Sequence, residues 1–436
     1  MKLLIILGIL VSSFVSSNIN DVLKVINIQT IGAIPNVRSY KVSQHNSNII
    51  IKSFEIANIS NIKNIYVPNN TFYISSIYIS NITNVNFIID GKLIANNNIK
   101  KWPIDELGNK MHIFKFFNVN NFIIKGSGTI DGQGFRWWWM AILSSTNKTI
   151  DNRPNMINIE QSYNFELSGI TMLNSPKFHV RLIDIINVNI HNFVIYVDTF
   201  RQNNLFEHYK IPTFPLNTDG IDLSVVNATV RNFNITNFDD SVAIKPCNNE
   251  YKYCKCSSNI LVYNGYVKFG VGMTVGSVQP NQNDNCVNNV IFKNVFMENP
   301  LKGIYIKTNR GNKGNGSITN ILYKNITMIS PIWWSIYIGP QQQKQPDGSG
   351  EGCMKYPHDP YCPTEPKITI ANITLKNINI QNSLNPYPGL LRCNETNICK
   401  RINFYNVSVN TMFDTYQYIC ENAEVKSIFS NPVLTC

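Results

Sequence analysis

The sequence has few of the features that mark membrane proteins or metal-binding proteins. Beyond the N-terminus, it has no apolar run long enough to span a bilayer. Cys254 and Cys256 are one residue apart and have no CxxC partner, which argues against a zinc site. A calcium-loop signature is also absent. We therefore expect no membrane association of the mature protein, no metal and no other cofactor.

Acidic side chains are fewer than basic ones, with 27 Asp and Glu against 38 Lys and Arg, and the net charge is +11. A basic protein is attracted to polyanions, although a diffuse surface charge can also serve solubility alone. The sequence does not place the lysines on one face. Nucleic acid is disfavoured as the polyanion because the N-terminus indicates export.

Residues 1–17 have the pattern of a signal peptide. Lys2 supplies the charged start, Leu3–Val11 is a short apolar core, and Ser12–Ser17 supplies small residues for cleavage. The alternative, a membrane anchor, needs a longer apolar run. We predict a secreted, extracellular protein whose mature chain is 18–436.

Ten cysteines, an even number, agree with an oxidising compartment. Six of them lie near the C-terminus at spacings that suggest local loops, although the sequence does not give their pairing: Cys353/Cys362, Cys393/Cys399 and Cys420/Cys436. Exposed N-x-S/T sequons would carry sugar in a secreted protein, for example Asn81, Asn147, Asn227, Asn234, Asn325, Asn372 and Asn406. We predict a disulfide-bonded glycoprotein.

A unit of asparagine followed by alternating apolar residues recurs along the chain. Most repeats are about 23 to 43 residues apart, the spacing of solenoid coils: they begin at Asn84, Asn121, Asn164, Asn187, Asn259, Asn289, Asn320, Asn372 and Asn403. Asparagines at one corner can stack as a hydrogen-bonded ladder while Ile, Val and Phe fill the bore. We predict an all-β chain that forms a single-stranded, right-handed parallel β-helix.

Length alone would suggest two or three domains, but the repeat favours one domain over 18–436. Residues Val42–Ala57 are predicted to form a helix that caps the open N-terminal end of the solenoid. Two insertions break the repeat. Asp198–Pro215 is expected to overhang a cleft, and Gln341–Pro366 is interpreted as a disulfide-closed surface loop, with a substrate lid as the alternative.

Four aspartates fall within one stretch, LNTDGIDLSVVNATVRNFNITNFDDSVAIK, at Leu216–Lys245. Asp219 and Asp240 are 21 residues apart, about one coil. Because adjacent coils lie about 4.8 Å apart, their carboxylates are expected on one surface within roughly 5 to 9 Å, together with Asp239. Glycoside hydrolysis needs such a set of acids and bases. Asp222 is interpreted as structural.

The alternative is that these aspartates only form turns, since Asn, Asp and Gly cluster at turns in any Asn-rich chain. The adjacent pair Asp239 and Asp240 favours a function. Two neighbouring carboxylates repel each other and cost stability without a use.

Several short motifs together resemble the polygalacturonases and their relatives in glycoside hydrolase family 28. They cover nearly the whole mature chain: I-Y-V-P-N-N-T-F-Y-I-S at 65–75, G-T-I-D-G-Q-G-F-R-W-W at 128–138, N-S-P at 174–176, N-T-D-G-I-D at 217–222 and D-D-S-V-A-I-K at 239–245. The resemblance implies a pectic polysaccharide as the substrate, cleaved with inversion at the anomeric carbon. We expect the protein to act as a monomer.

The resemblance also implies roles for single residues. Asp239 would be the general acid, and Asp219 and Asp240 would bind and deprotonate the attacking water. Asn217 would orient a neighbouring carboxylate or a sugar hydroxyl. Lys307 would pair with a uronic acid carboxylate as a point charge, unless it is a solvated lysine at a strand end.

Two positions depart from the family pattern. Val271 stands where the G-H-G element has histidine, and Tyr305 stands where the R-I-K element has arginine. Valine does not titrate and tyrosine carries no positive charge at neutral pH, so tight recognition of galacturonate is in question. Tyr305 would offer a stacking face to a sugar ring, with core packing as the alternative. His179 is a distant candidate to replace the missing histidine.

These departures leave other readings open. One is a weakened or non-catalytic β-helix that binds the cell wall. Another is a hydrolase of rhamnogalacturonan or xylogalacturonan, since Val271 and Tyr305 would suit a methylated or substituted sugar. A third is a calcium-dependent pectate lyase, which needs a strongly basic arginine near the scissile bond. Arg231 is the only arginine in the acidic stretch.

Overall fold

The computed structural model describes residues 24–146, 151–199, 214–343, 362–414 and 416–436. The predicted signal peptide at 1–17 and most of the two insertions lie outside these ranges. Across the described ranges, every helix is too short or too polar to cross a membrane.

The described chain forms one parallel sheet of 23 strands wound into a right-handed β-helix, as predicted. The strands are β1 (Val25–Asn27), β2 (Asn64–Val67), β3 (Thr71–Ile74), β4 (Ile77–Ile89), β5 (Lys92–Ala95), β6 (Phe114–Lys125), β7 (Thr129–Asp131), β8 (Ile157–Ser168), β9 (Thr171–Leu173), β10 (Val180–Tyr196), β11 (Ile221–Asn237), β12 (Val242–Ile244), β13 (Ser257–Phe269), β14 (Met273–Val278), β15 (Asn285–Glu298), β16 (Lys302–Thr308), β17 (Gly316–Ile329), β18 (Trp334–Gln341), β19 (Ile368–Ser383), β20 (Leu390–Arg392), β21 (Cys399–Thr411), β22 (Ile419–Glu421) and β23 (Ala423–Ile428).

Each strand pairs with the strands one coil below and one coil above. Thus β13 pairs with β11 and β15, while the shorter β14 pairs with β12 and β16 on another side of the coil. Along β15, buried residues alternate with partly exposed ones. Side chains of a strand point alternately to its two faces. Those on one face, mostly Ile, Val and Phe, fill the bore, and those on the other face point outward.

Asparagines occupy the corners of the coils in the left-handed region, where their φ values are close to +55°; Asn259, for example, has φ 58°. Their side chains form the predicted ladder, in which Asn289 Nδ2 donates to Asn259 Oδ1 at 2.7 Å. A second ladder runs through Asn232, Asn264 and Asn294. Asparagine suits these corners because it tolerates positive φ and carries both a donor and an acceptor.

The N-terminal end of the bore is covered by α2 (Tyr40–Ile59), where the sequence predicted a helix at Val42–Ala57. The helix buries Ile50, Phe54 and Ala57 against the first coils. The ring of Phe54 lies 5.3 Å from that of Phe87 and 6.0 Å from those of two further phenylalanines, Phe116 and Phe122. These apolar contacts close the end of the solenoid.

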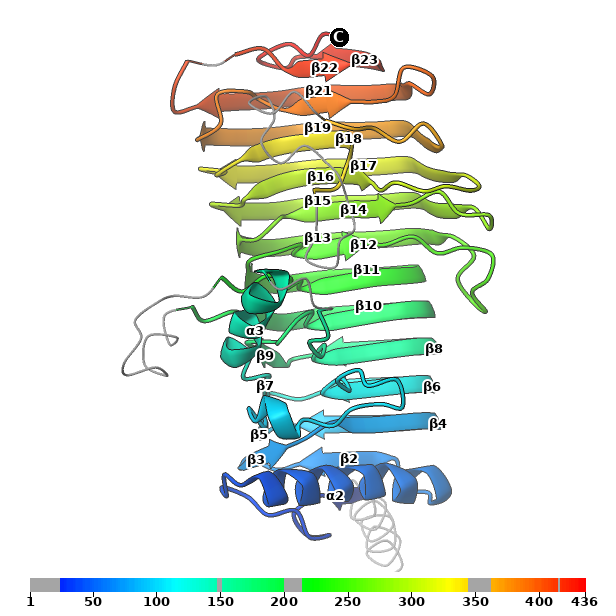
Figure 1. Ribbon diagram of the computed structural model, residues 1–436, viewed down its shortest axis with the longest axis vertical. Helices are drawn as coiled ribbons and strands as arrows, with labels where there is room; N and C mark the ends of the chain where they lie inside the picture. Colours follow the sequence, from blue (N-terminus) through cyan, green and yellow to red (C-terminus); the bar gives the residue numbers. More distant parts are fainter. Residues whose placement is uncertain (1–23, 147–150, 200–213, 344–361, 415) are drawn as a thin grey trace, which may run out of the picture.

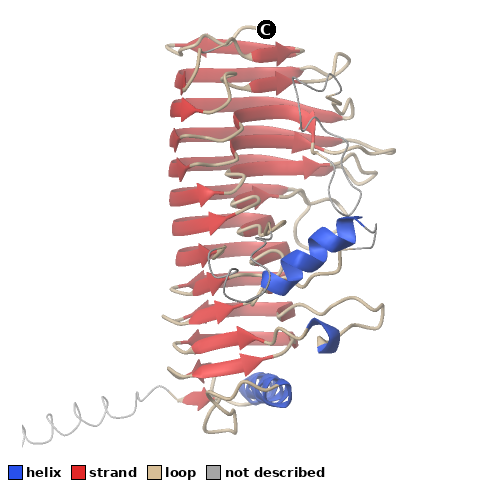
Figure 2. Cartoon of the chain, turned by 60° about the vertical axis from the view of Figure 1, so that its left-hand side comes forward, coloured by secondary structure: helices blue, strands red, loops and turns tan. Residues whose placement is uncertain are grey.

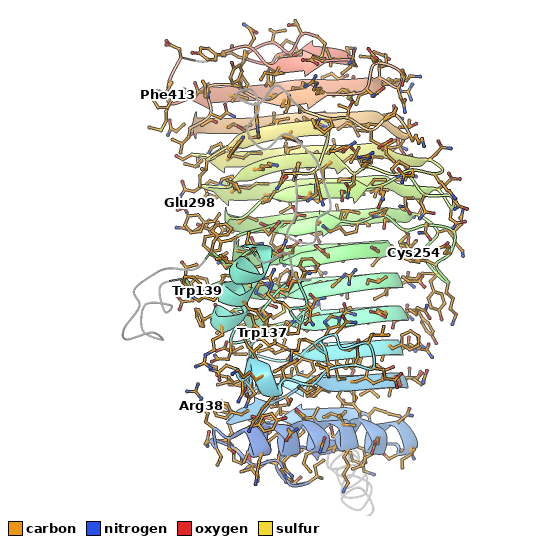
Figure 3. The ribbon with its side chains drawn as sticks, in the orientation of Figure 1. Arg38, Trp137, Trp139, Cys254, Glu298 and Phe413 are labelled. Atoms are coloured by element: carbon orange, nitrogen blue, oxygen red, sulfur yellow. A yellow bond between two sulfur atoms is a disulfide. The ribbon has the colours of Figure 1, made fainter. Side chains whose placement is uncertain are left out.

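Two further helices, η1 (Ile99–Lys101) and α3 (Phe135–Thr146), lie outside the stack on one side of it. Trp137 and Trp139 of α3 lie at the side opposite the loop that carries Cys254 (Figure 3). Trp138 Nε1 donates to the Ser175 carbonyl at 3.0 Å, which fastens α3 to the N-S-P turn.

Disulfides close several loops at the outside of the coils. Cys393–Cys399 and Cys420–Cys436 are the local pairs that the spacing suggested. Two further disulfides, Cys247–Cys254 and Cys256–Cys286, were not suggested by spacing. The third suggested pair includes Cys353, which lies outside the described residues.

Candidate active site

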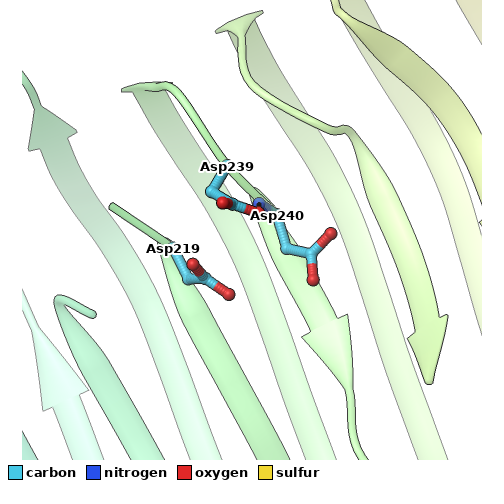
Figure 4. A group of neighbouring side chains, drawn as sticks. All are labelled: Asp219, Asp239 and Asp240. Atoms are coloured by element: carbon cyan, nitrogen blue, oxygen red, sulfur yellow. Dashed lines mark hydrogen bonds between the residues drawn. The ribbon is translucent and has the colours of Figure 1, made fainter. Parts of the chain in front are cut away.

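The acids of the candidate site lie at the starts of two neighbouring strands. Ile221 of β11 pairs with Val242 of β12, so Asp219 and Asp240, each two residues earlier, lie at equivalent positions one coil apart. One carboxylate oxygen from each of Asp219, Asp239 and Asp240 lies within 4.8 Å of the others, and Figure 4 shows the three side chains gathered at these strand ends. The structure therefore brings together the three acids predicted from the sequence.

The glycine of N-T-D-G allows this close approach. A Cβ on Gly220 would lie 2.3 Å from the Ser241 carbonyl oxygen of the next coil. The Gly220 amide donates to the Asp240 carbonyl at 2.8 Å, so the two acidic turns are joined through their backbones. A larger residue would push these turns apart.

Asp240 is surrounded by groups that stabilise its charge. Lys307 Nζ and Lys245 Nζ lie 2.9 and 3.1 Å from Oδ2, and Thr274 Oγ1 donates to Oδ1 at 2.7 Å. Burial opposes ionisation of Asp240, but the charges of Lys307 and Lys245 outweigh it and lower the pKa below its usual value. Asp240 is therefore a carboxylate at neutral pH.

The pKa values of the other two acids, Asp219 and Asp239, are shifted in the opposite direction. Burial raises the pKa of Asp219 well above its usual value, and the charge of Asp239 raises it further. Burial and then the charge of Asp240 raise the pKa of Asp239. Two acids that share one site do not ionise independently, so the ionised Asp240 favours a proton on one of its neighbours.

Asp239 is the most accessible of the three acids, and Asn217 contacts it. Asn217 Nδ2 donates to Asp239 Oδ2 at 3.5 Å, and Arg153 Nη2 donates to Asn217 Oδ1 at 2.9 Å. Arg153 is in turn fixed by Asp151, whose Oδ1 lies 2.9 Å from Nε. Asn217 thus lies beside the Asp239 carboxylate, as the sequence predicted. Its orientation depends on Arg153, which is 64 positions earlier in the chain.

His179 does not replace the missing histidine. Its side chain is fully buried, with Nδ1 3.0 Å from the Asp219 carbonyl and Nε2 accepting from the Ser175 amide at 3.3 Å. Burial lowers the pKa of His179 to about 4, so the ring is neutral near pH 7. It supports the backbone of Asp219 and makes no hydrogen bond to a site carboxylate within the described chain.

Tyr305 lines the cavity of the acids and is packed in an apolar cluster beside it. Its ring is fully buried, with Lys302 Nζ 3.9 Å and Lys307 Nζ 4.7 Å from the ring centre. The hydroxyl donates to Gln343 Oε1 at 2.9 Å. Val271 packs in the same apolar cluster and lines the cavity beside the acids. Val271 and Tyr305, which stand in place of the family's histidine and arginine, therefore form apolar packing, and the Tyr305 ring lies against the buried Lys302.

The sequence reasoning missed four participants in the site. Lys245 reaches Asp240, Asp222 and Asp219, with Nζ 3.6 Å from Asp222 Oδ2 and 3.9 Å from Asp219 Oδ2. Asp222, interpreted as structural, lies in the same cavity as the other acids. Lys245 was within reach of sequence analysis, since it alternates with the buried Val242 and Ile244 and must face outward. Thr274 and Arg153 carry no local signal.

The three clustered carboxylates could in principle hold a cation. However, the ammonium groups of Lys307 and Lys245 already contact Asp240, and a divalent ion would have to bind beside two positive charges. The donor set therefore fits acid–base chemistry better than metal coordination.

A β-helix that carries the clustered Asp219, Asp239 and Asp240 is typical of a glycoside hydrolase. The model for Glycosyl hydrolases family 28 matches residues 57–429, and the chain belongs to this family.

Relatives of known activity resemble parts of the chain. An endo-polygalacturonase of Pectobacterium carotovorum subsp. carotovorum is 33% identical over 202 residues, which is 44% of this chain and 44% of that protein. An exopolygalacturonase of Cochliobolus carbonum is 26% identical over 309 residues, or 69% of this chain and 63% of that protein. The matches thus cover about half the length of these curated relatives.

Solved structures share the fold at low identity. The polygalacturonase from Erwinia carotovora ssp. carotovora superposes with a TM-score of 0.66 at 24% identity, covering 87% of this chain and 93% of that chain. The endo-xylogalacturonan hydrolase from Aspergillus tubingensis gives a TM-score of 0.65 at 19% identity, covering 95% and 98%.

Proposed function

We propose that this protein is a secreted hydrolase that cleaves α-1,4-galacturonosyl or related linkages of pectic polysaccharide by single displacement. The observation that carries the proposal is the cluster of Asp219, Asp239 and Asp240, in which only Asp240 is held ionised by two lysines. The net charge of +11 suits an anionic polymer, and the relatives that match the chain are polygalacturonases.

In the proposed reaction Asp239 donates a proton to the glycosidic oxygen, because it is the most accessible acid and its pKa is raised by burial and by Asp240. Asp219 and Asp240 hold the attacking water. As its oxygen bonds to the anomeric carbon and the glycosidic bond breaks, the water's proton passes to this pair, for which the raised pKa of Asp219 makes it the better acceptor. Asp219 lines the same cavity as the other acids, and in the described part of the chain its Oδ1 has no hydrogen-bond partner. Lys307 and Lys245 keep Asp240 ionised through the reaction, so that it can accept a hydrogen bond from the water.

The spacing of the acids does not by itself decide the stereochemistry. Carboxyl pairs of inverting enzymes are about 6.5 to 9.5 Å apart and those of retaining enzymes about 5 to 5.5 Å. Here the nearest oxygens lie within 4.8 Å. Inversion therefore rests on the pairing of Asp219 with Asp240 as water-binding groups, and proton NMR of the first product would decide it. A product that keeps the α configuration would exclude single displacement.

The test of the activity is a panel of pectic polymers incubated with the wild type and with Asp239→Asn. The amide keeps the shape of the side chain but has no acidic proton, so we expect a loss of about 10² to 10⁴-fold in turnover. The circular dichroism spectrum of the variant should match that of the wild type. Equal turnover by both folded proteins would remove Asp239 from the mechanism, and no turnover by the wild type would favour a wall-binding protein.

Secretion is part of the proposal. The pattern at 1–17 supports it, and so do the disulfides, which persist in oxidising compartments. Expression in a secreting host followed by N-terminal sequencing of the protein in the medium tests it. We expect the mature chain to begin at Asn18.

A further inference from the structure

Arg181 lies on the floor of the cleft, on the N-terminal side of the acids. It is the second residue of β10, between the fully buried Val180 and Leu182, so it points outward. In the parallel register it is one coil from Asp222. The same outward column continues in both directions along the solenoid: Tyr78, Lys115, Asn158, Arg181, Asp222, Ala243, Thr274 and Tyr305.

Arg181 joins two cavities. It lines the cavity that contains the acids, and it also lines a second cavity toward the N-terminus, with Tyr78, Lys115 and His112. Lys177 lines both cavities as well. The two cavities therefore form one cleft that crosses successive coils, with Arg181 near its middle.

Within the described ranges, the guanidinium of Arg181 makes no hydrogen bond and no ion pair, although the side chain is partly buried and its charge acts on Asp222 one coil away. The other cations of the acid cavity are engaged, since Lys245 and Lys307 contact Asp240 and Lys177 contacts Asp151 at 3.2 Å. Of the cations that line this cavity in the described chain, Arg181 alone is free to bind an anion.

We propose that Arg181 binds the carboxylate of a uronic acid unit on the N-terminal side of the cleavage point and so determines the preference for an acidic polymer. This inference rests on the proposed function. A guanidinium is planar and can donate two parallel hydrogen bonds to a carboxylate. Because neighbouring coils are about 4.8 Å apart, Arg181 lies one to two coils from the acids, the range of a sugar unit next to the cleaved bond.

This placement explains how an acidic substrate could be recognised without an arginine at position 305. The side chain at that position is buried, and Lys307 is drawn to Asp240. Arg181 lies on the opposite side of the acids, where it lines both cavities and makes no hydrogen bond or ion pair within the described chain.

The test compares Arg181→Gln and Arg181→Lys on two substrates, polygalacturonate and its methyl ester. A hydrogen bond to a charged group has an effect of roughly 10 to 100-fold on binding. We expect Arg181→Gln to lose that much in kcat/KM on polygalacturonate, mainly through KM, and to change little on the ester. Arg181→Lys should recover part of the loss, because lysine restores the positive charge but not the two parallel hydrogen bonds.

The matched control is Arg231→Gln. Arg231 lies in β11, is bonded to Asn189 on another side of the coil and lines neither cavity of the cleft. Its replacement should leave both substrates unaffected. An equal loss on both substrates with Arg181→Gln, or no loss on either, would overturn the assignment.

Binding of trigalacturonate to Asp239→Asn, measured by calorimetry with and without Arg181→Gln, separates this inference from the proposed activity. If the wild type hydrolyses nothing but trigalacturonate binds in an Arg181-dependent way, the activity is wrong and the inference stands. If polygalacturonate is cleaved equally well without Arg181, the inference is wrong and the activity stands. Absence of both turnover and binding overturns both.

Discussion

The aspartates of the site differ in charge because their neighbours differ. Asp240 contacts two ammonium groups and a hydroxyl, while Asp239 accepts from the uncharged Asn217 amide and from the Asp240 backbone amide. Similar carboxyl groups therefore divide into a permanent anion and a proton carrier. Such a division is how a single site supplies both a base and an acid near neutral pH.

Lys245 tunes these acids, and its replacement should move the pH profile. Its charge lowers the pKa of Asp240, Asp219 and Asp239. In Lys245→Met all three pKa values rise. The acidic limb of kcat/KM, where the water-binding acids must ionise, and the basic limb, where Asp239 must keep its proton, should both move to higher pH by about one unit or more.

The measurement is the pH dependence of kcat/KM within the range where Lys245→Met stays folded. Lys268→Met is the control, because Lys268 pairs with Glu298 on the outer surface and lies outside the cavity of the acids. An unchanged profile, or a shift to lower pH, would show that Lys245 does not act on the reacting acids.

At the scale of the element, the corner asparagines keep consecutive strands in register. Each one adopts a backbone conformation that other side chains resist and bonds to its counterpart one coil away. Two separate requirements therefore select the same residue type. This is why the pattern is visible in the sequence.

Asn264 allows the two requirements to be measured separately. It has φ 55°, donates to Asn232 at 3.4 Å and accepts from Asn294 at 3.2 Å. Asn264→Gly loses only the hydrogen bonds, whereas Asn264→Ala also places a Cβ in the left-handed region. We expect the alanine variant to be less stable than the glycine variant by about 1 kcal/mol.

Chemical denaturation of the wild type, Asn264→Gly and Asn264→Ala measures this difference in the free energy of unfolding. Equal m-values for the three proteins would show that the same transition is compared. Asn264 is followed by glycine and tyrosine and is no sequon, so attached sugar does not confuse the result. Equal stability of the two variants would mean that the corner conformation does not select asparagine here.

The sequence predicts what depends on the repeat, and it fails where side chains meet across coils without a local pattern. The corner ladders and the cluster of Asp219 with Asp240 follow from coil spacing, and the N-terminal helix follows from the need to cover the open end of the solenoid. The burial of Tyr305 depends on Lys302 and Gln343, and the orientation of Asn217 depends on Arg153. No short-range rule links these pairs, so the sequence predicts neither contact.

On the scale of the whole molecule, the coils are stacked along one long axis (Figure 1). The cavity linings come from successive coils, so the cleft runs along that axis. Its floor receives one outward residue from each coil. An extended polymer bound there would meet Lys115, Arg181 and Lys307 in turn. The molecule as a whole carries +11, which adds a general attraction to that local pattern.

This long-range attraction predicts a dependence on salt. Raising the ionic strength from 0.01 to 0.15 M shortens the screening length from about 30 to about 8 Å. We expect KM for polygalacturonate to rise over this range and KM for the methyl ester to stay nearly constant, with kcat steady for both. Initial rates at fixed pH measure this. A KM for polygalacturonate that does not respond to salt would confine recognition to close contacts.

The pairing of each coil only with its neighbours also bears on how such proteins diverge. Duplication of one coil between β10 and β11 would move Arg181 away from the acids by about 4.8 Å and so change which unit of the chain it binds. Duplication beyond β17 would leave acids and arginine in place. Gain and loss of whole coils is thus an evolutionary route by which a lineage can retune substrate length while its catalytic residues stay the same.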